Sequence, residues 1–337
     1  MTRMRRYIQL ALALGFLAAA GMLVQPLRRS QVRYDLTSEP VKGVSPGVVL
    51  ATTALGAFRG VIVDVVWIRM ENLKNDGKFF ELVQLADLAC RLAPRFPKVW
   101  DFNAWNMAYN VSVQVPEYPR RWPWVKKGIE LLRSQGIPNN PEEPELYFSL
   151  AWIFMHKVGD QLDDAHFFYK QELGLWMHEI LGGPGSRETL TEFAGAPSTR
   201  EALLGEEDVK KLYEDLLQAG FDPLDRTSVG DTARFFVWVR RPGEIPEQAR
   251  EILEAEGYRE EVEKMSNFLR ARRLAEINMD PEVMLDLMDQ YGPLDWRGPY
   301  AHAIYWASEG KRVAESYQQR ARAEREGKGD GAKEWGS

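Results

Sequence analysis

The 337-residue sequence predicts an all-α protein, and three observations lead to this class. Apolar residues recur at helical spacing through most of the chain, as they do between Leu82 and Leu92. Glycine and proline signals such as Gly77 and Pro94 separate these runs. No alternating apolar and polar pattern of useful length indicates a strand. We therefore expect helical hairpins, preceded by an amino-terminal transmembrane helix and followed by further carboxy-terminal helices.

The clearest predicted hairpin runs from Val61 to Pro94. Its first helix is expected over residues 61–74 and ends at Asn75-Asp76-Gly77, a turn signal whose glycine tolerates a positive φ. The second helix places its apolar residues along one face before a proline ends it: Leu82, Ala86, Ala89 and Leu92.

Two further hairpins are predicted after the first. One carries the small residue Ala104 between the large Trp100 and Met107, which lets a neighbouring helix approach closely. Its second helix is expected over residues 124–134, after a longer connection. The other hairpin starts at Pro144 and presents its packing residues on one helix: Tyr147, Leu150, Ala151 and Phe154.

The packing residues of the first hairpin recur at the offsets of a tetratricopeptide repeat: Gly77, Leu82, Ala86, Ala89 and Pro94. Residues 60–181 therefore resemble the tetratricopeptide-repeat family, although the second and third hairpins are stretched or slipped against its period. The resemblance implies an α-solenoid of stacked helical hairpins that holds other proteins.

The resemblance also implies a binding groove. The inward-facing positions of the family, carried over one by one, fall on Asp64, Trp67, Glu71, Asp101, Trp105, Tyr109, Phe148, Trp152 and His156. Those expected to contact an extended or helical peptide are Trp67, Asp101, Trp105, Tyr109, Phe148, Trp152 and His156. The alternative is that these aromatic residues pack against the later helices of the same chain, which has 11 tryptophans to bury.

The amino terminus is basic and is followed by an uncharged, mostly apolar run over residues 8–24. Its length lies at the lower edge of what spans a bilayer. It is either a retained single-pass anchor or a cleaved signal with its small-residue site at Ala18-Ala19-Ala20. The apolar run continues past that site to Val24, which favours the anchor. An anchor of this kind predicts the inner (cytoplasmic) membrane, with the bulk of the chain on the non-cytoplasmic side.

These features predict a division of the chain into six parts. The parts are an anchor or signal at 1–30, a juxtamembrane linker and short helix at 31–59, tetratricopeptide-like repeats at 60–181, a loop at 182–204, a helical region at 205–325 and a disordered tail at 326–337. The loop is predicted from its beginning at Gly182-Gly183-Pro184-Gly185, and the tail from its polar, glycine-rich composition.

The composition excludes several classes of protein. A net charge of -6 and a pI near 5.5 argue against a protein that binds nucleic acid through its phosphates. Cys90 is the only cysteine, so a monomer can form neither an internal disulfide nor a multi-cysteine zinc site. We expect its thiol to be buried and inert.

Acids and histidines between Asp163 and His178 mark the place where a metal or catalytic chemistry could sit. No His-Glu-x-x-His spacing is present, and aspartates near a helix start are favourable without an ion, so no metal is expected. A possible second binding site is the turn that carries Asp295, Trp296 and Arg297. The alternative there is that Asp295 caps a helix and pairs with Arg297.

The sequence therefore favours a membrane-anchored, tetratricopeptide-like scaffold or adaptor that binds another protein or peptide at the cell envelope. The alternative is an envelope enzyme that uses the Asp163–His178 cluster or Asp295. No serine elbow, phosphate loop or metal motif supports the enzyme. We expect no cofactor and no nucleic-acid partner.

Overall fold

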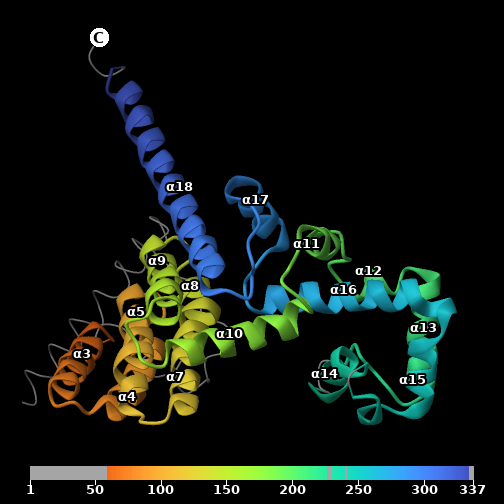
Figure 1. The fold of residues 1–337 in the computed structure, drawn as a ribbon. Helices are drawn as coiled ribbons and strands as arrows, with labels where there is room; N and C mark the ends of the chain where they lie inside the picture. Colours follow the sequence, from red (N-terminus) through yellow and green to blue (C-terminus); the bar gives the residue numbers. More distant parts are fainter. Residues whose placement is uncertain (1–58, 226–228, 240, 334–337) are drawn as a thin grey trace, which may run out of the picture. The chain divides into compact units, whose positions relative to one another are not determined.

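The computed structural model of the chain describes residues 59–225, 229–239 and 241–333 (Figure 1). These residues form α, π and 3-10 helices joined by turns, and no strand occurs among them. The predicted all-α class is therefore confirmed for this part of the chain. Contacts between Cα atoms divide the whole chain into two units, Met1–Ala51 and Thr52–Ser337, and every described residue belongs to the second.

The first hairpin consists of α3 (Arg59–Asn75) and α4 (Phe79–Leu92). Gly77 lies between them with a φ of +71°, a left-handed conformation that glycine adopts without steric cost. The turn predicted at this glycine is therefore present. α4 directs its small and apolar residues to the core: Leu82, Val83, Ala86, Ala89 and Cys90.

Two longer hairpins follow, and their helices continue into π-helical segments. The elements are α5 (Pro97–Trp105), the π-helix η2 (Asn106–Val111), α6 (Ser112–Gln114), α7 (Tyr118–Leu131), the π-helix η3 (Leu132–Gly136), α8 (Ile137–Asn139), α9 (Pro144–Trp152), the π-helix η4 (Ile153–Gly159) and α10 (His166–Leu181). α5 and α9 match closely, since each is 9 residues long, begins with proline and passes directly into a π-helix. Proline suits this first position because the N–H group that it lacks would be unpaired there.

The helices of the second hairpin approach each other closely at three small residues, Ala104, Ala108 and Gly128. A Cβ atom at Gly128 of α7 would lie 2.8 Å from the carbonyl oxygen of Ala104 and 3.4 Å from the Cβ atom of Ala108. Such a distance leaves no room for a side chain at position 128. The small residue predicted at position 104 therefore lies at a close helix crossing.

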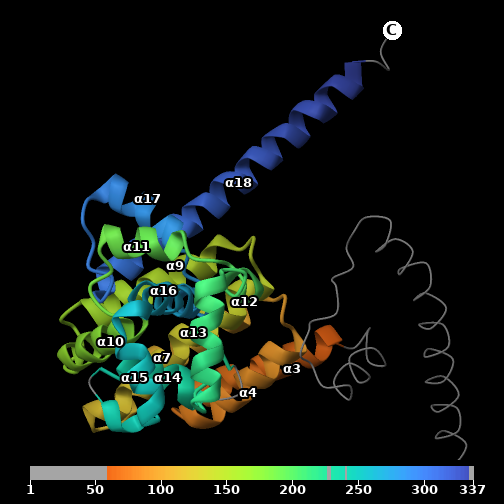
Figure 2. The same ribbon diagram turned by 90° about the vertical axis from the view of Figure 1, so that its right-hand side faces the viewer.

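The carboxy-terminal helix α18 (Pro299–Lys333) begins beside the third hairpin, as Figure 1 and Figure 2 both show. The hydroxyl group of Tyr300 donates to the carbonyl oxygen of Gly159 over 2.9 Å. At Gly310 an added Cβ atom would lie 2.9 Å from that of Tyr147, so α18 approaches α9 closely. The start of α18 thus completes the core of the hairpin region.

The remaining described helices pack either in this larger core or in a second, smaller core. They are α11 (Arg187–Ala194), α12 (Arg200–Leu203), α13 (Glu207–Gln218), α14 (Val229–Val237), the 3-10 helix η5 (Pro242–Glu244), α15 (Glu247–Glu254), the 3-10 helix η6 (Glu256–Tyr258), α16 (Arg259–Glu276) and α17 (Pro281–Tyr291). Of these, α11 and α17 pack in the larger core. α16 belongs to both cores, because Phe268 packs in the smaller one and Leu274 in the larger one.

The structure differs from two predicted boundaries. Segment 182–204, predicted as a loop, contains α11 and α12. Ser186 caps α11 by accepting from the backbone N–H of Thr189 over 3.3 Å, and Thr199 caps α12 in the same way. The loop was predicted from the glycine-rich turn that precedes these caps, and the turn does not extend through the segment. α18 also continues past the predicted tail boundary at residue 326, to Lys333.

The predicted membrane anchor at residues 8–24 and the juxtamembrane segment up to residue 58 lie outside the described residues. Among the helices that the structure does describe, none combines the length and the apolar character needed to cross a bilayer. The anchor therefore stays a prediction from the sequence.

Candidate binding surface

Two pairs of stacked rings form the centre of the candidate site. Trp105, the last residue of α5, stacks on Tyr109 of η2 with ring centroids 4.1 Å apart and an angle of 20° between the planes. Trp152, the last residue of α9, stacks on His156 of η4 with centroids 5.0 Å apart and an angle of 14°. The matching helices α5 and α9 thus present matching ring pairs.

A polar contact joins the two pairs into one array. The hydroxyl group of Tyr109 lies 3.3 Å from Nδ1 of His156, and the centroids of these two rings are 5.8 Å apart. Burial raises the pKa of Tyr109 above its usual range, so its phenol stays protonated. The four rings therefore come together from two segments that are far apart in the sequence.

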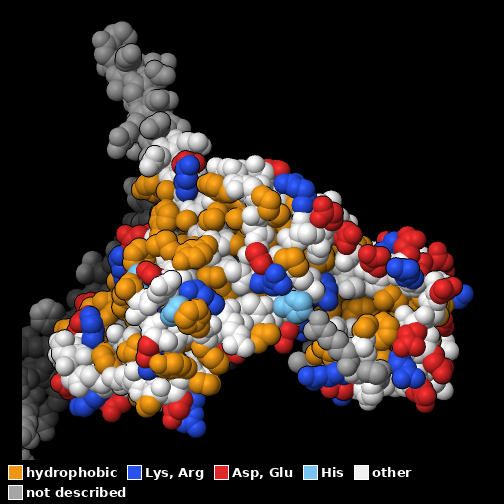
Figure 3. Space-filling model, in the orientation of Figure 1, with side chains coloured by type: hydrophobic (Ala, Val, Ile, Leu, Met, Phe, Trp, Pro, Cys, Tyr) orange, Lys and Arg blue, Asp and Glu red, His pale blue; other side chains and the backbone are white. Residues whose placement is uncertain are grey.

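The indoles of this array remain accessible to solvent. Trp105 is 43% exposed and Trp152 is 42% exposed, and Phe148, one turn before Trp152, is 45% exposed. Figure 3 shows one face of the molecule, where hydrophobic side chains reach the surface over α9 and the start of α18. We call the set of Trp105, Tyr109, Phe148, Trp152 and His156 the aromatic surface.

Two other predicted binding residues, Trp67 and Asp101, lie outside the aromatic surface. Trp67 of α3 is partly buried and packs against Phe102 and Phe96, with ring centroids 5.1 Å and 6.2 Å away. It belongs to a separate ring cluster. Asp101 is partly buried on α5, one helical turn before Trp105. It therefore borders the aromatic surface.

A buried ion-pair network lies behind the rings. Lys157 of η4 is only 3% exposed, and its ammonium group pairs with the carboxylate of Asp163. Arg121 of α7 lies 3.6 Å from the same carboxylate and also pairs with Asp164. The Nζ atom of Lys157 is 5.4 Å from the ring centroid of Tyr109. The network thus ties α7, η4 and the start of α10 together beneath the aromatic surface.

The network holds Asp163 and Asp164, two of the acids that the sequence marked as candidates for catalysis. Burial lowers the pKa of Lys157, while the hydrogen bond to Asp163 opposes that shift. Asp163 also accepts a hydrogen bond from the backbone N–H of Ala165 over 2.9 Å. Within the described ranges, no group of three or more histidine, cysteine, aspartate or glutamate side chains is arranged to hold a metal ion.

The predicted second site separates into a surface pair and a buried ring. Arg297 donates from Nε and Nη2 to the two carboxylate oxygens of Asp295 over 2.9 Å and 2.8 Å, and these bonds lower the pKa of Asp295. Trp296 is fully buried, and its Nε1 donates to the sulfur atom of Met288 over 3.5 Å. The indole therefore presents no surface to a ligand.

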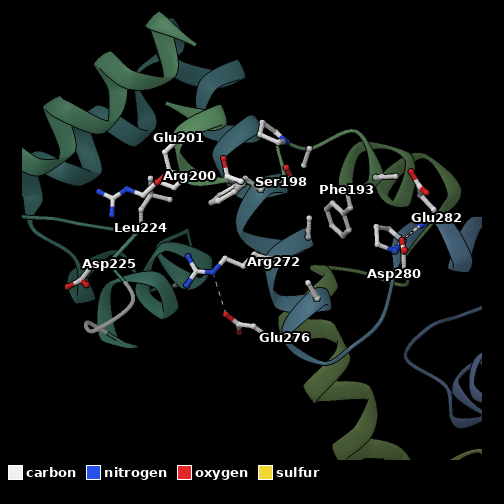
Figure 4. Close-up of a pocket in the computed structure, with 18 residues that line it drawn as sticks. Phe193, Ser198, Arg200, Glu201, Leu224, Asp225, Arg272, Glu276, Asp280 and Glu282 are labelled. Atoms are coloured by element: carbon white, nitrogen blue, oxygen red, sulfur yellow. Dashed lines mark hydrogen bonds and ion pairs between the residues drawn. The ribbon is translucent and has the colours of Figure 1, made fainter. Parts of the chain in front are cut away.

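A cleft of about 1080 Å³ lies between the segment that joins α11 to α12 and the helices α16 and α17 (Figure 4). Some of its polar side chains already have partners within the cleft. Arg272 lies 3.5 Å from Glu276, and Asp280 accepts from the backbone N–H of Glu282 over 2.8 Å. None of the site residues that were predicted from the sequence lines this cleft. Segments distant along the chain form the cleft, and no local motif in the sequence indicated it.

Comparisons with known proteins add no family to this description. No protein-family model matches the chain, and neither a curated protein nor a solved structure matches it. The function proposed below therefore depends on the geometry and chemistry of the aromatic surface.

Proposed function

We propose that this chain is a scaffold or adaptor that docks a protein or peptide partner on the aromatic surface. The observation that carries the proposal is the joining of two half-exposed indoles, Trp105 and Trp152, into one array through Tyr109 and His156. Tryptophan and tyrosine dominate the energetic centres of protein interfaces because they offer large, rigid contact areas with a polar edge.

The rigid backing of the surface also favours docking. Each indole stacks on a neighbouring ring, and Lys157 and Asp163 fix η4 from behind. Little side-chain entropy is then lost when a partner binds, which increases affinity for a given contact area. The acids of the enzyme alternative, Asp163 and Asp295, already pair with cationic side chains. This pairing favours a structural role for both.

The proposal includes a tetratricopeptide-like arrangement of the hairpins. Three consecutive pairs of helices support it: α3 with α4, α5 with α7, and α10 with η4, the continuation of α9. The residues carried over from the family positions in the second and third hairpins lie together, as a shared repeat would require. The glycine turn and closing proline of the first hairpin are further support.

The proposal also includes a membrane tether. Its support is the uncharged apolar run at residues 8–24 after a basic amino terminus. The scaffold would then hold its partner at the non-cytoplasmic side of the inner membrane. Fractionation of cells that express the full chain, or the chain without residues 8–24, tests this part of the proposal separately. Recovery of both forms in the soluble fraction would contradict it.

The docking function is tested by affinity purification of the full chain from detergent-solubilised membranes. The test variant is Trp105→Ala with Trp152→Ala, which removes both exposed indoles. The control is Tyr291→Ala with Tyr317→Ala, which removes two rings that are 55% and 62% exposed on α17 and α18. We expect the test variant to lose a partner that the wild type and the control both retain, with unchanged helical content by circular dichroism. Retention of every partner by the test variant would overturn the proposal.

A further inference from the structure

We infer that the aromatic surface takes lysine or arginine side chains of its partner on the outer faces of Trp105 and Trp152. This inference rests on the proposed docking function and names the chemistry of the occupant. Three observations support it: the exposure of the two indoles, the acidic border of the surface and the cations that rings of this chain already hold.

Each indole has one covered face and substantial exposure. Tyr109 covers one face of Trp105, and His156 covers one face of Trp152, yet the two indoles are 43% and 42% exposed. The π-electron face of tryptophan attracts a cation more strongly than that of any other side chain. Part of each indole is therefore accessible to an ammonium or guanidinium group from solvent.

Acidic residues border the surface at the amino-terminal ends of α5 and α9. Asp101 lies one turn before Trp105, and Glu143 and Glu145 lie at the start of α9, before Phe148. Lys98 lies at this border and pairs with Glu145, and Arg320 of α18 pairs with Glu142, next to Glu143. Lys157 beneath the rings is buried and pairs with Asp163. The charge left for a partner is therefore negative, which complements a basic segment.

Aromatic rings elsewhere in the described chain already hold cations in this way. The Nζ atom of Lys126 lies 4.3 Å from the ring centroid of Trp176, and the guanidinium carbon of Arg133 lies 4.7 Å from the same ring. Within the aromatic surface itself, Lys157 approaches the ring of Tyr109 from the protein interior. The outer indole faces of the aromatic surface offer the same chemistry to a second molecule.

Fluorescence anisotropy with labelled peptides tests the inference on the full-length protein in detergent. The probe is two copies of Gly-Arg-Ala-Lys in tandem. Its neutral match carries citrulline in place of arginine and acetyl-lysine in place of lysine, so shape is kept and charge is removed. We expect the neutral peptide to bind about ten-fold more weakly than the charged one. We expect a similar loss for Trp105→Ala with Trp152→Ala, and a smaller loss for Asp101→Asn.

Each other outcome overturns the inference in a recognisable way. Equal, tryptophan-dependent binding of the charged and neutral peptides would mean that the surface takes apolar segments, and the docking function would stand. Binding of the charged peptide that persists in the double tryptophan variant would be general attraction to an acidic protein. If the charged peptide does not bind at all, the inference is also overturned. The docking function is then tested by the affinity purification alone. The control variant, Tyr291→Ala with Tyr317→Ala, should bind as the wild type does.

Discussion

The hydroxyl group of Tyr109 lies 3.3 Å from Nδ1 of His156, although the two residues are 47 positions apart in the sequence. The contact joins the π-helix of the second hairpin to that of the third. It also aligns the ring pair that contains Trp105 with the pair that contains Trp152. One hydrogen bond between neighbouring hairpins thus gives the aromatic surface its continuity.

Replacement of Tyr109 by phenylalanine should weaken this connection. Tyr109→Phe keeps the stacked ring but removes the contact to His156, and we expect a loss of about 0.5–1.5 kcal/mol in the free energy of unfolding. Urea unfolding of the variant and wild type measures the difference. Tyr317→Phe is the control, because that ring is 62% exposed on α18. Equal stability of the Tyr109 variant and the wild type would show that the hydroxyl contact contributes nothing.

Replacement of Asp163 by asparagine should destabilise the fold strongly. Asp163→Asn leaves the ammonium group of Lys157, which is only 3% exposed, without a charged partner. Breaking a buried ion pair in this way typically costs about 3–5 kcal/mol. The matched control is Asp164→Asn, since that side chain is 60% exposed and its loss should cost about 1 kcal/mol or less. Similar melting temperatures for the two variants would contradict a buried role for Asp163.

The residues of the aromatic surface could be predicted because repeat positions are periodic. Trp105 and Trp152 are each the ninth residue of a helix that begins with proline, at Pro97 and at Pro144. The pairing of Asp295 with Arg297 was also foreseen, as a local interaction within one turn.

Long-range arrangements could not be predicted in the same way. Nothing local indicates that Arg121 meets Asp163, because α7 and α10 must first pack together. The burial of Trp296 likewise depends on Met288 of a neighbouring helix. π-Helices are rare, and no residue pattern in the sequence indicated the segments η2, η3 and η4. Helix α11 was not predicted, although its cap residue Ser186 is visible in the sequence, because the glycines before Ser186 indicated a loop.

A methyl group at Gly128 should destabilise the second hairpin. The added Cβ atom of Gly128→Ala would lie 2.8 Å from the carbonyl oxygen of Ala104. Overpacking of this kind costs about 1–3 kcal/mol, against about 1 kcal/mol that alanine gains over glycine within a helix. Gly174→Ala in α10 is the matched control, because its nearest neighbour would be 3.8 Å away. Thermal unfolding should show a lower melting temperature for the first variant and an equal or higher one for the second.

The thiol of Cys90 should be unreactive in the folded protein. Cys90 is 1% exposed, and burial raises its pKa to about 12, so hardly any thiolate exists at neutral pH. We expect the native chain to react with a thiol-specific reagent such as Ellman's reagent far more slowly than the chain unfolded in guanidinium. Equal rates in the two states would mean that the thiol is accessible.

Protonation of His302 should make the fold less stable in mild acid. His302 is fully buried, its ring stacks on Phe154, and Nε2 lies 3.0 Å from the carbonyl oxygen of Trp296. Burial, with a contribution from Arg133, lowers its pKa from 6.5 to about 3. The unfolded chain therefore binds a proton between these two values that the folded chain does not bind. The contribution of neutral His302 to the free energy of unfolding is fully present above pH 6.5. It falls as the pH drops towards 3, by up to about 1.4 kcal/mol per pH unit.

The measurement is the free energy of unfolding between pH 5 and pH 6.5, where few carboxylates change their charge. Glutamine in His302→Gln can still donate to the carbonyl oxygen of Trp296, but it does not titrate. We expect the variant to be less stable than the wild type at pH 7, because the ring contact with Phe154 is lost. The free energy of unfolding of the variant should also change less with pH than that of the wild type. The difference between the two slopes is up to about 1.4 kcal/mol per pH unit. Parallel curves for the two proteins would show that His302 titrates alike in the folded and unfolded chains.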